Sequence, residues 1–354
     1  MAQVGIFGAS GFVGTALTLR LLDLGHQVQA LVRRPADWPL QHNNLKVTKG
    51  SIADADCVSR VLEECDCAFY LVHGLAEAGA DFEYQEALGA TRFAQTARKQ
   101  RFKKVIYLGG LGPDGELSSH LRSRHLVGEI LGLALPAAIE FRASIVLGPQ
   151  STSFEMLKAL TQRLPFRPYA PWLETLCQPI ALENLLQYLT AAIDCEVLGH
   201  TVVEIGAPEV LPYGELLDHM IRLEGLTRPK FLLPPVEQRL LLPVLDLVIP
   251  EFAEVGKKLF LSLQHPTVVT DGKARELFPE ITPMSVAEAL RMAHEASTTS
   301  YPALWEGDFW KELRELARHQ TRHGQERLVE KLKDMSLGYS EKILRKSLWR
   351  RKDQ

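Results

Sequence analysis

The sequence predicts an α/β fold, with a doubly wound parallel sheet followed by a smaller cap of mixed and helical structure. Three observations support this prediction. Short apolar segments alternate with segments of helical periodicity over the first 150 residues. A turn with three glycines separates the first apolar segment from the first helical one, and prolines interrupt the rhythm after residue 150. Strands that alternate with helices of this length imply right-handed crossovers and a sheet covered on both faces.

The expected strands are short runs rich in β-branched and aromatic residues, such as VGIF and CAFYLV. They are predicted at 4–7, 28–32, 45–48, 67–72, 105–108 and 138–147. Apolar residues spaced three and four apart predict the intervening helices at 12–24, 54–63, 82–100 and 119–133. Gly25 ends the first of these helices, and Asp54 is the expected amino-terminal cap of the second.

The chain divides into three regions by composition and rhythm. Residues 1–150 form the expected sheet domain, residues 151–295 the cap, and residues 296–354 a charged helical extension. Inside the cap region, a helix at 183–193 and a strand at 200–205 are expected to rejoin the main sheet. Residues 211–278 are predicted to be helical with proline breaks, with a short strand inside 264–271.

The overall composition argues against several classes of protein. A net charge of −3 gives no reason to expect a nucleic-acid partner, and 46% hydrophobic residues suffice for a packed core. Five scattered cysteines predict reduced thiols and no metal site, because they lack the paired spacing of metal ligands. The first residues show no signal-peptide pattern, so we expect a cytoplasmic protein.

Two segments raise the question of contact with a membrane surface. Residues 240–252 are apolar but fall short of the ~20 residues that a spanning helix needs. They therefore either lie on a membrane surface or pack inside the cap. The carboxyl-terminal end is basic, which fits either a solvated terminal helix or contact with anionic lipid.

A glycine-rich turn follows the first strand in the spacing GxxGxxG. Glycine permits the tight turn, lets the backbone approach a pyrophosphate at the positive end of the helix, and allows close packing of helix on sheet. In the context of a strand, a turn and a helix, this spacing indicates a Rossmann dinucleotide-binding fold. Residues 1–150 are therefore predicted to be an NAD(P)-binding Rossmann domain. The expected contacts in the turn come from Gly8, Ser10, Gly11, Phe12, Val13 and Gly14.

The end of the second strand indicates which dinucleotide is bound. Arg33 and Arg34 stand where a carboxylate would bind the ribose hydroxyls of NAD, and the next acidic residue is Asp37. Guanidinium groups match the oxygens of a 2′-phosphate, so NADP(H) is favoured and NAD(H) is the alternative. The competing interpretation is two exposed arginines beside a proline turn. The expected contacts around the adenosine are Ser51, Ile52, Leu71, Val72 and a structural His73.

Several strings resemble the short-chain dehydrogenase/reductase superfamily, namely FGASGFVG, LVRRP, YLVHG, VIYLGGLGPDGELSSHLRSRHLVGEIL, EFRASIVLGPQSTSFEMLKAL and QPIALENLLQYL. The resemblance covers residues 3–293 and is strongest to atypical and extended members, which include NmrA-like, NAD(P)H-binding and nucleoside-diphosphate-sugar-epimerase-like proteins. Relatives of this group include the nucleotide-binding accessory subunit of respiratory complex I. The resemblance implies an NAD(P) cofactor and oxidoreductase or epimerase chemistry.

The sequence departs from this superfamily at its catalytic motif. Superfamily enzymes carry a tyrosine, and a lysine four residues later, on the helix after strand five, with a serine at the end of that strand. Here Gly109 and Gly110 replace the serine, and His120 and Arg124 occupy the tyrosine and lysine places in one register. In the register shifted by one, Leu121 and His125 occupy those places. His120 and Arg124 are the candidate catalytic pair, and the alternative is a polar helix start that only holds the nicotinamide or a phosphate.

Two functions of different class follow from these observations. The first is an NADPH-dependent reductase or epimerase-like enzyme that acts on a small apolar or quinone-like substrate under the cap. The second is a non-catalytic NADPH-binding sensor, or an assembly or stability factor, which the missing Tyr-xxx-Lys pair favours. The apolar side chains expected to line the cap, or alternatively to form its core, are Phe154, Met156, Leu157, Leu160, Phe166, Tyr169 and Trp172.

Overall fold

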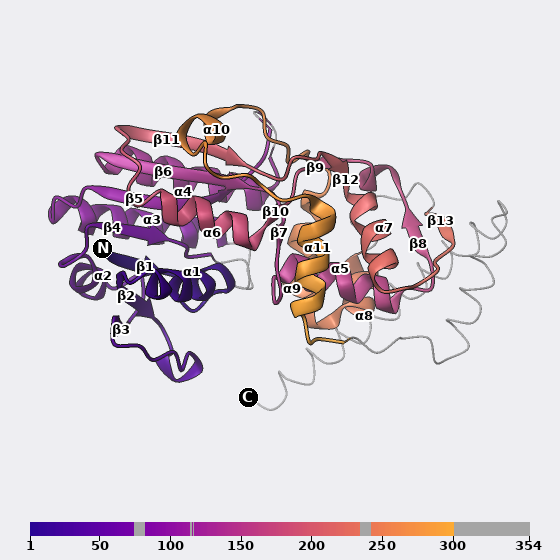
Figure 1. Ribbon diagram of the computed structural model, residues 1–354, viewed down its shortest axis with the longest axis horizontal. Helices are drawn as coiled ribbons and strands as arrows, with labels where there is room; N and C mark the ends of the chain where they lie inside the picture. Colours follow the sequence, from indigo (N-terminus) through magenta and orange to yellow (C-terminus); the bar gives the residue numbers. More distant parts are fainter. Residues whose placement is uncertain (74–81, 114, 116, 234–241, 301–354) are drawn as a thin grey trace, which may run out of the picture.

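The computed structural model describes residues 1–73, 82–113, 115, 117–233 and 242–300 (Figure 1). Its main element is a seven-stranded parallel sheet in the order β11-β6-β5-β4-β1-β2-β3. This order confirms the predicted doubly wound Rossmann sheet. The strands are β1 (Gln3–Phe7), β2 (Gln27–Val32), β3 (Leu45–Lys49), β4 (Cys67–Tyr70), β5 (Lys104–Gly110), β6 (Ala137–Ala143) and β11 (Gly199–Ile205).

Strand β1 lies at the point where the strand order reverses. Ile6 of β1 is paired with Ala30 of β2 on one side and with Phe69 of β4 on the other. The crossovers from β1 and from β3 therefore run to opposite sides, which opens a crevice beyond the carboxyl ends of the strands. Ligands of doubly wound sheets bind in such a crevice, which begins here at Gly8 and Leu71.

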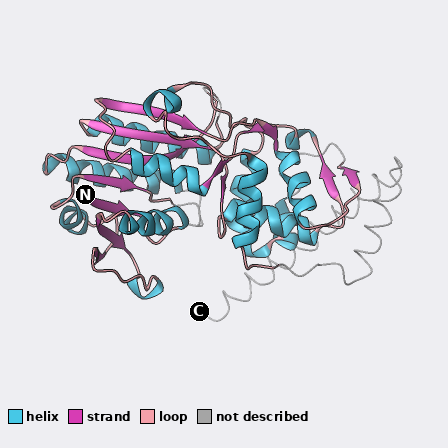
Figure 2. Ribbon diagram, in the orientation of Figure 1, coloured by secondary structure: helices cyan, strands magenta, loops and turns pink. Residues whose placement is uncertain are grey.

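Helices cover both faces of the sheet (Figure 2). Each face has its own apolar core, formed around Leu17 and Phe278 on the first face and around Val58 and Phe93 on the second. The first face carries α1 (Phe12–Asp23), α6 (Leu182–Ala191) and α10 (Lys273–Leu277). The second face carries α2 (Ala55–Leu62), α3 (Phe82–Lys99) and α4 (Ser119–Ala134).

The cap packs beside the carboxyl edge of the sheet and is mainly helical (Figure 1). Phe154, Leu216, Met220 and Leu290 form the centre of its largest apolar cluster. Its helices are α5 (Thr152–Arg163), α7 (Tyr213–Leu223), α8 (Leu242–Val248), α9 (Ala253–Ser262) and α11 (Val286–Ala296). Its strand pairs are β7 (Val146–Leu147) with β10 (Ile180–Ala181), β9 (Leu176–Cys177) with β12 (Leu211–Pro212), and β8 (Arg167–Tyr169) with β13 (Lys230–Leu232).

The predicted elements of the sheet domain agree with the structure except in one strand. The carboxylate of Asp54 accepts hydrogen bonds from the backbone amides of Asp56 and Cys57, so the predicted cap of α2 is confirmed. The single strand predicted at 138–147 is wrong, because the chain leaves the main sheet at Ser144 and β7 then pairs with β10. The helix and strand expected at 183–193 and 200–205 correspond to α6 and β11, the latter at the edge of the main sheet.

Predictions for the cap were less accurate than those for the sheet domain. The strand predicted inside 264–271 is reduced to one isolated bridge, between Thr267 and Cys177. The region 211–278 also contains β12 and β13, which the helical pattern did not predict. Strands of two or three residues are too short to show a period, so only their partners define them. The charged helical extension predicted at 296–354 lies outside the described residues from 301 onward.

The apolar stretch 240–252 contributes to the interior of the cap where the structure describes it. Leu245, Val248 and Ile249 are buried in a cluster with Met156 and Phe260. Residues 240 and 241 lie outside the described part of the chain. Within the residues that the structure describes, no helix has both the length and the apolar character needed to cross a bilayer.

Phe93 anchors the second face of the sheet beside the glycine turn. Its ring is fully buried and contacts Phe7, with ring centroids 4.8 Å apart, and Tyr70, with centroids 5.2 Å apart. Phe7 immediately precedes Gly8, so this packing also supports the start of the turn.

We expect Phe93→Ala to lower the free energy of unfolding by about 3–5 kcal/mol, the usual cost of emptying a buried aromatic site. Urea denaturation followed by circular dichroism measures this change. Leu133→Ala is the control, because Leu133 of α4 is 89% exposed. The control should change the free energy by less than about 0.5 kcal/mol. Equal stability of Phe93→Ala and the wild type would contradict the packing described.

Candidate functional site

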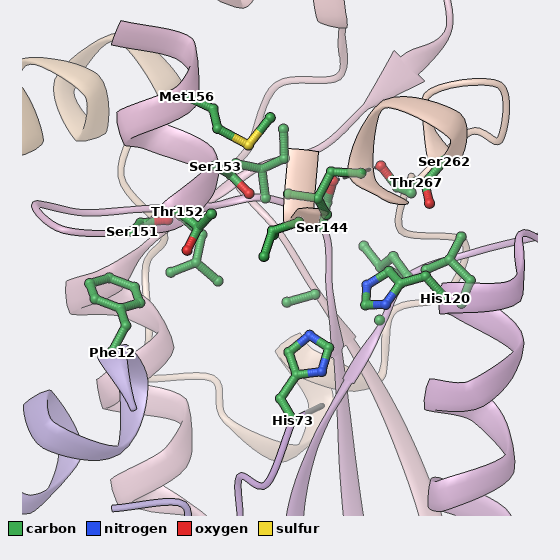
Figure 3. A pocket seen from close by; sticks show the side chains of 18 of the residues that line it. Phe12, His73, His120, Ser144, Ser151, Thr152, Ser153, Met156, Ser262 and Thr267 are labelled. Atoms are coloured by element: carbon green, nitrogen blue, oxygen red, sulfur yellow. Dashed lines mark hydrogen bonds between the residues drawn. The ribbon is translucent and has the colours of Figure 1, made fainter. Parts of the chain in front are cut away.

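A cavity of about 570 Å³ lies where the carboxyl edge of the sheet meets the cap (Figure 3). On the sheet side it is lined by the glycine turn, the ends of β4, β5 and β6, and the start of α4. On the cap side it is lined by α5, α7 and α9. The cavity therefore joins the predicted nucleotide turn to the predicted substrate region.

The glycine turn has no room for side chains. Gly8 has a φ of +95°, and a Cβ there would lie 2.5 Å from the carbonyl oxygen of Leu71. A Cβ on Gly14 would lie 2.1 Å from the carbonyl oxygen of Gly8. The first backbone amides of α1 have no acceptor within the helix, and its first turn carries no acidic residue. This bare, positively polarised helix end fits a pyrophosphate group.

About half of the predicted cofactor residues lie on the cavity wall. These lining residues are Gly8, Gly11, Phe12, Val13, Gly14, Leu71 and His73. Ser10 is exposed beside the turn, and Val72 packs into the core of the second face. The Ser51 hydroxyl accepts a hydrogen bond from the amide of Ala53, and Ile52 packs against the same core.

Arg33 and Arg34 lie outside the cavity, directly after the end of β2. Both are exposed, and the Arg34 side chain is 82% exposed. Arg34 Nε lies 3.1 Å from the carboxylate of Asp37. The two arginines thus flank the crevice on the side where a doubly wound sheet binds the adenosine end of a dinucleotide.

Two histidines face each other inside the cavity. The rings of His73 and His120 are stacked, with centroids 5.2 Å apart, and both point into the open space in Figure 3. His73 Nδ1 lies 3.0 Å from Glu86 Oε1. Glu86 lies on α3 and also accepts a hydrogen bond from the Ser123 hydroxyl of α4. Neither the His73–Glu86 contact nor the stacking was predicted from the sequence.

Glu86 is an ionised carboxylate in a buried place. Burial acts to raise its pKa, but the hydrogen bond from His73 and the charge of Arg124 outweigh burial and lower the pKa to about 2. The carboxylate therefore remains charged at neutral pH and acts as an acceptor only.

His120 is neutral at physiological pH. Burial, followed by the charges of His73 and Arg124, lowers the pKa of His120 to about 3. Its Nδ1 is buried and has no hydrogen-bond partner among the residues that the structure describes. Ser118 caps α4 by accepting from the amide of Leu121, which fixes the start of the helix that carries His120. A buried ring nitrogen that faces a cavity without a partner is suited to a ligand hydrogen bond.

Arg124 is buried one helical turn after His120 and lines the same cavity. Its guanidinium lies over the ring of Tyr107, 4.9 Å from the ring centroid, and its carbonyl accepts a 2.9 Å hydrogen bond from the Tyr107 hydroxyl. Burial raises the pKa of Tyr107, which is a core residue. The positive charge of Arg124 acts to lower the pKa of Glu86 and so helps to keep this carboxylate ionised.

Among the hydroxyl groups that line the cavity, three are connected to one another, and sequence reasoning did not find them. The Thr267 hydroxyl lies 2.6 Å from that of Ser144 and 2.9 Å from that of Tyr213. Burial raises the pKa of Tyr213, so its phenol stays protonated. The residues are far apart in the sequence, so no local pattern connects them. Connected hydroxyls of this kind can hold one oxygen atom of a ligand.

The cap side of the cavity is predominantly apolar. Of the residues expected to line it, Met156, Leu157 and Leu160 do so, whereas Phe154 is buried in the cap core. Phe166 packs on Phe231, Trp172 packs on Phe260, and Tyr169 is exposed at the surface. The helices α7 and α9 complete the wall with Leu216, Leu217, Leu259, Phe260 and Leu263.

Comparison with known proteins finds a family match for the first part of the chain. Residues 8–138 match a family described as NAD(P)H-binding. A subunit of the Arabidopsis thaliana mitochondrial NADH dehydrogenase, 1 alpha subcomplex subunit 9, is 25% identical over 61% of this chain and 56% of its own length. A ceramide reductase of Caulobacter vibrioides is 26% identical over 47% of this chain and 53% of its own length. The chain thus spans just over half of each of these two relatives.

Solved structures share the fold over most of the chain. The Bordetella bronchiseptica enzyme WbmH, in complex with NAD+, superposes with a TM-score of 0.62 at 18% identity, over 83% of this chain and 98% of that one. A Thermotoga maritima UDP-glucose 4-epimerase with UDP-glucose superposes with a TM-score of 0.63 at 15% identity, over the same shares. At these identities the likeness concerns the fold.

We expect Gly14→Ala to abolish the stabilisation of the protein by NADPH, because its Cβ would displace the backbone of Gly8. The wild type should gain about 2.7 kcal/mol when the ligand is at a hundredfold excess over its Kd. Thermal denaturation with and without NADPH measures the gain for each variant relative to its own ligand-free state.

Gly5→Ala in β1 is the matched control for this experiment. A Cβ on Gly5 would meet its nearest neighbours at 3.4–3.6 Å, which is ordinary van der Waals contact. This variant should retain the full NADPH-dependent gain. Retention of the gain by Gly14→Ala would show that the turn does not bind the pyrophosphate.

Proposed function

We propose that this chain, an NAD(P)H-binding protein with the short-chain dehydrogenase/reductase fold, is an NADPH-dependent oxidoreductase of a small apolar carbonyl or quinone-like compound. One observation carries the proposal. A single cavity joins the bare glycine turn to the apolar cap, and polar groups from both parts line it. Such an arrangement would bring a cofactor and an apolar substrate together in one space.

The proposed cofactor is NADPH. Gly8, Gly11 and Gly14 would hold its pyrophosphate against the start of α1, and Arg33 with Arg34 would bind the 2′-phosphate. When bound, the cofactor supplies a hydride. The residues of the chain bind and orient the reactants and exclude water from them.

The proposed substrate is apolar with one polar oxygen. Leucines of α5, α7 and α9 surround most of the cap side, so a charged substrate would lose its hydration there without compensation. The hydroxyls of Ser144, Thr267 and Tyr213 would hold the substrate oxygen. A relative named as a ceramide reductase is consistent with an apolar substrate.

His120 and Arg124 have supporting roles in this proposal. His120 offers an unpartnered Nδ1 to the nicotinamide or the substrate, but its lowered pKa keeps the ring neutral. Arg124 lines the same cavity and favours the charge of Glu86. The pair predicted from the sequence as catalytic would thus orient the reactants.

A second function is favoured by one specific observation, the replacement of Tyr-xxx-Lys by His120 and Arg124. In this alternative the chain binds NADPH without turnover, as a sensor or as an assembly or stability factor. The relative in a mitochondrial NADH dehydrogenase is consistent with such a role. The two functions differ in whether NADPH is consumed.

We expect NADPH to stabilise the wild type against heat more than NADH does at equal concentration. Arg33→Asp should weaken NADPH binding about tenfold or more, since a charged hydrogen bond contributes about 1.5–3 kcal/mol. Thermal shift titrations with NADPH, NADP+, NADH and NAD+ measure these affinities. Arg98→Asp is the control, because Arg98 is exposed in the last turn of α3, at the amino-terminal ends of the strands and away from the crevice. Stronger stabilisation by NAD+ than by NADP+ would overturn the choice of cofactor.

We expect the wild type to oxidise NADPH in the presence of at least one of three probes: 9,10-phenanthrenequinone, menadione and decan-2-one. Tyr213→Phe should lower kcat/KM for that probe about three- to tenfold, the value of one neutral hydrogen bond of ~0.5–1.5 kcal/mol. Absorbance at the NADPH maximum measures the rate. Tyr84→Phe is the control, because Tyr84 is 65% exposed on α3. Stabilisation by NADPH without its consumption by any probe would favour the non-catalytic function instead.

A further inference from the structure

We propose that His73 and Glu86 form the proton-transfer pair of this site, in place of the tyrosine and lysine that the chain lacks. His73 would exchange a proton with the substrate oxygen through Nε2, and Glu86 would orient the ring from behind. This inference rests on the proposed oxidoreductase function and specifies how that function obtains its proton.

The position of His73 suits this role. The residue lies three positions after the end of β4, at the carboxyl edge of the sheet, and its ring enters the cavity between Phe12 and His120 in Figure 3. Because Nδ1 is bound to Glu86, Nε2 is the ring nitrogen left to meet a ligand. The same cavity contains the hydroxyls of Ser144 and Thr267, which would hold the substrate oxygen.

Glu86 determines which form of the imidazole is present. Its side chain is 5% exposed, and both of its oxygens have partners, His73 on one and Ser123 on the other. An ionised carboxylate accepts a hydrogen bond from Nδ1–H and so leaves the Nε2 lone pair directed away from it. The same carboxylate stabilises the positive ring that forms when Nε2 takes up a proton. This arrangement of a buried carboxylate behind a histidine orients a general base or acid.

The charged groups around His73 come from three helices. Glu86 on α3 favours the protonated ring, whereas Arg124 on α4 and Lys258 on α9 oppose it, and the stacked His120 is neutral. Burial is the largest effect, and the sum lowers the pKa of His73 below its ordinary value of 6.5. His120 lacks a carboxylate on its Nδ1, so no group comparably stabilises its positive form. Of the two histidines, His73 is therefore the better proton carrier.

His73 transfers one proton in either direction of the reaction. In reduction, the carbonyl carbon accepts the hydride of NADPH, and the electron pair of the C=O π bond moves to the oxygen. The oxygen takes the proton from Nε2 of protonated His73, which leaves a neutral ring that solvent protonates again. In oxidation of the alcohol by NADP+, neutral His73 removes the hydroxyl proton. Glu86 keeps its charge throughout.

The test compares His73→Gln and Glu86→Gln with the wild type, using the probe that the wild type reduces fastest of the three named above. Both variants should reduce it about 10²-fold more slowly, the usual contribution of a general acid. Glu86→Gln should keep its thermal stabilisation by NADPH within about threefold in Kd, because Glu86 is not among the residues that line the cavity, and the rates of all variants are compared at saturating NADPH. His42→Gln is the control, since His42 lies in an exposed loop and its ring accepts a hydrogen bond from the amide of Asn44. Imidazole in the buffer should partly restore the rate of His73→Ala.

The pH dependence separates proton transfer from a structural role. The wild-type rate of reduction should fall as pH rises through the pKa of His73, because only the protonated ring donates. In Glu86→Gln this falling limb should move to lower pH, since the carboxylate that favours the protonated ring is gone. NMR titration of the His73 ring, without any substrate, should show the same downward shift of its pKa.

The possible results distinguish this inference from the function on which it rests. If the wild type reduces a probe and His73→Gln does so equally fast, the proton-transfer pair is wrong and the oxidoreductase function stands. A His73 titration unchanged in Glu86→Gln would also overturn the pair. If no probe is reduced by the wild type, both the function and the pair fail together.

Discussion

The close approach of β1, β4 and α1 at the glycine turn is the constraint on which the rest of the structure depends. The carbonyl oxygen of Gly8 would be 2.1 Å from a Cβ on Gly14, and a Cβ on Gly8 would be 2.5 Å from the carbonyl oxygen of Leu71. The absence of side chains brings a helix start to the crevice between two parallel strands. The polarised amides at this point favour an anionic ligand. The cavity begins here because the backbone is exposed here.

Helix α4 is the second fixed element, and two buried carboxylates contact it. Glu86 of α3 accepts from Ser123 of α4. Glu140 of β6 lies under Gly128 of α4, where a Cβ would be 2.1 Å from its Oε2. Burial acts to raise the pKa of Glu140, but its bonds to His200 and Arg142 outweigh burial and lower the pKa. Buried carboxylates with several partners set the position of the helix, and with it the place of His120.

The cap supplies what the sheet domain lacks. The sheet domain provides backbone amides, two histidines and a buried carboxylate, whereas the cap provides the apolar wall and the hydroxyls of Thr267 and Tyr213. The NAD(P)H-binding family covers only residues 8–138, so the likeness is strongest where the cofactor is expected. The wall that would select a substrate lies mainly outside this range. The cap therefore accounts for the chemical identity of the substrate in our proposal.

The sequence by itself determined the strands and helices of the sheet domain, the glycine turn and the cap at Asp54, because each depends on residues close together in the chain. Only the tertiary structure decided the functional groupings. The ring of His73 contacts the carboxylate of Glu86 on the following helix. The hydroxyl of Ser144 contacts that of Thr267, which lies 123 positions later in the chain. The tertiary structure also determined where β6 ends, because the strand stops at Ala143 and the next strand, β7, pairs with β10. Periodicity reports which face of an element is buried, whereas the partner of a polar group depends on how distant elements pack.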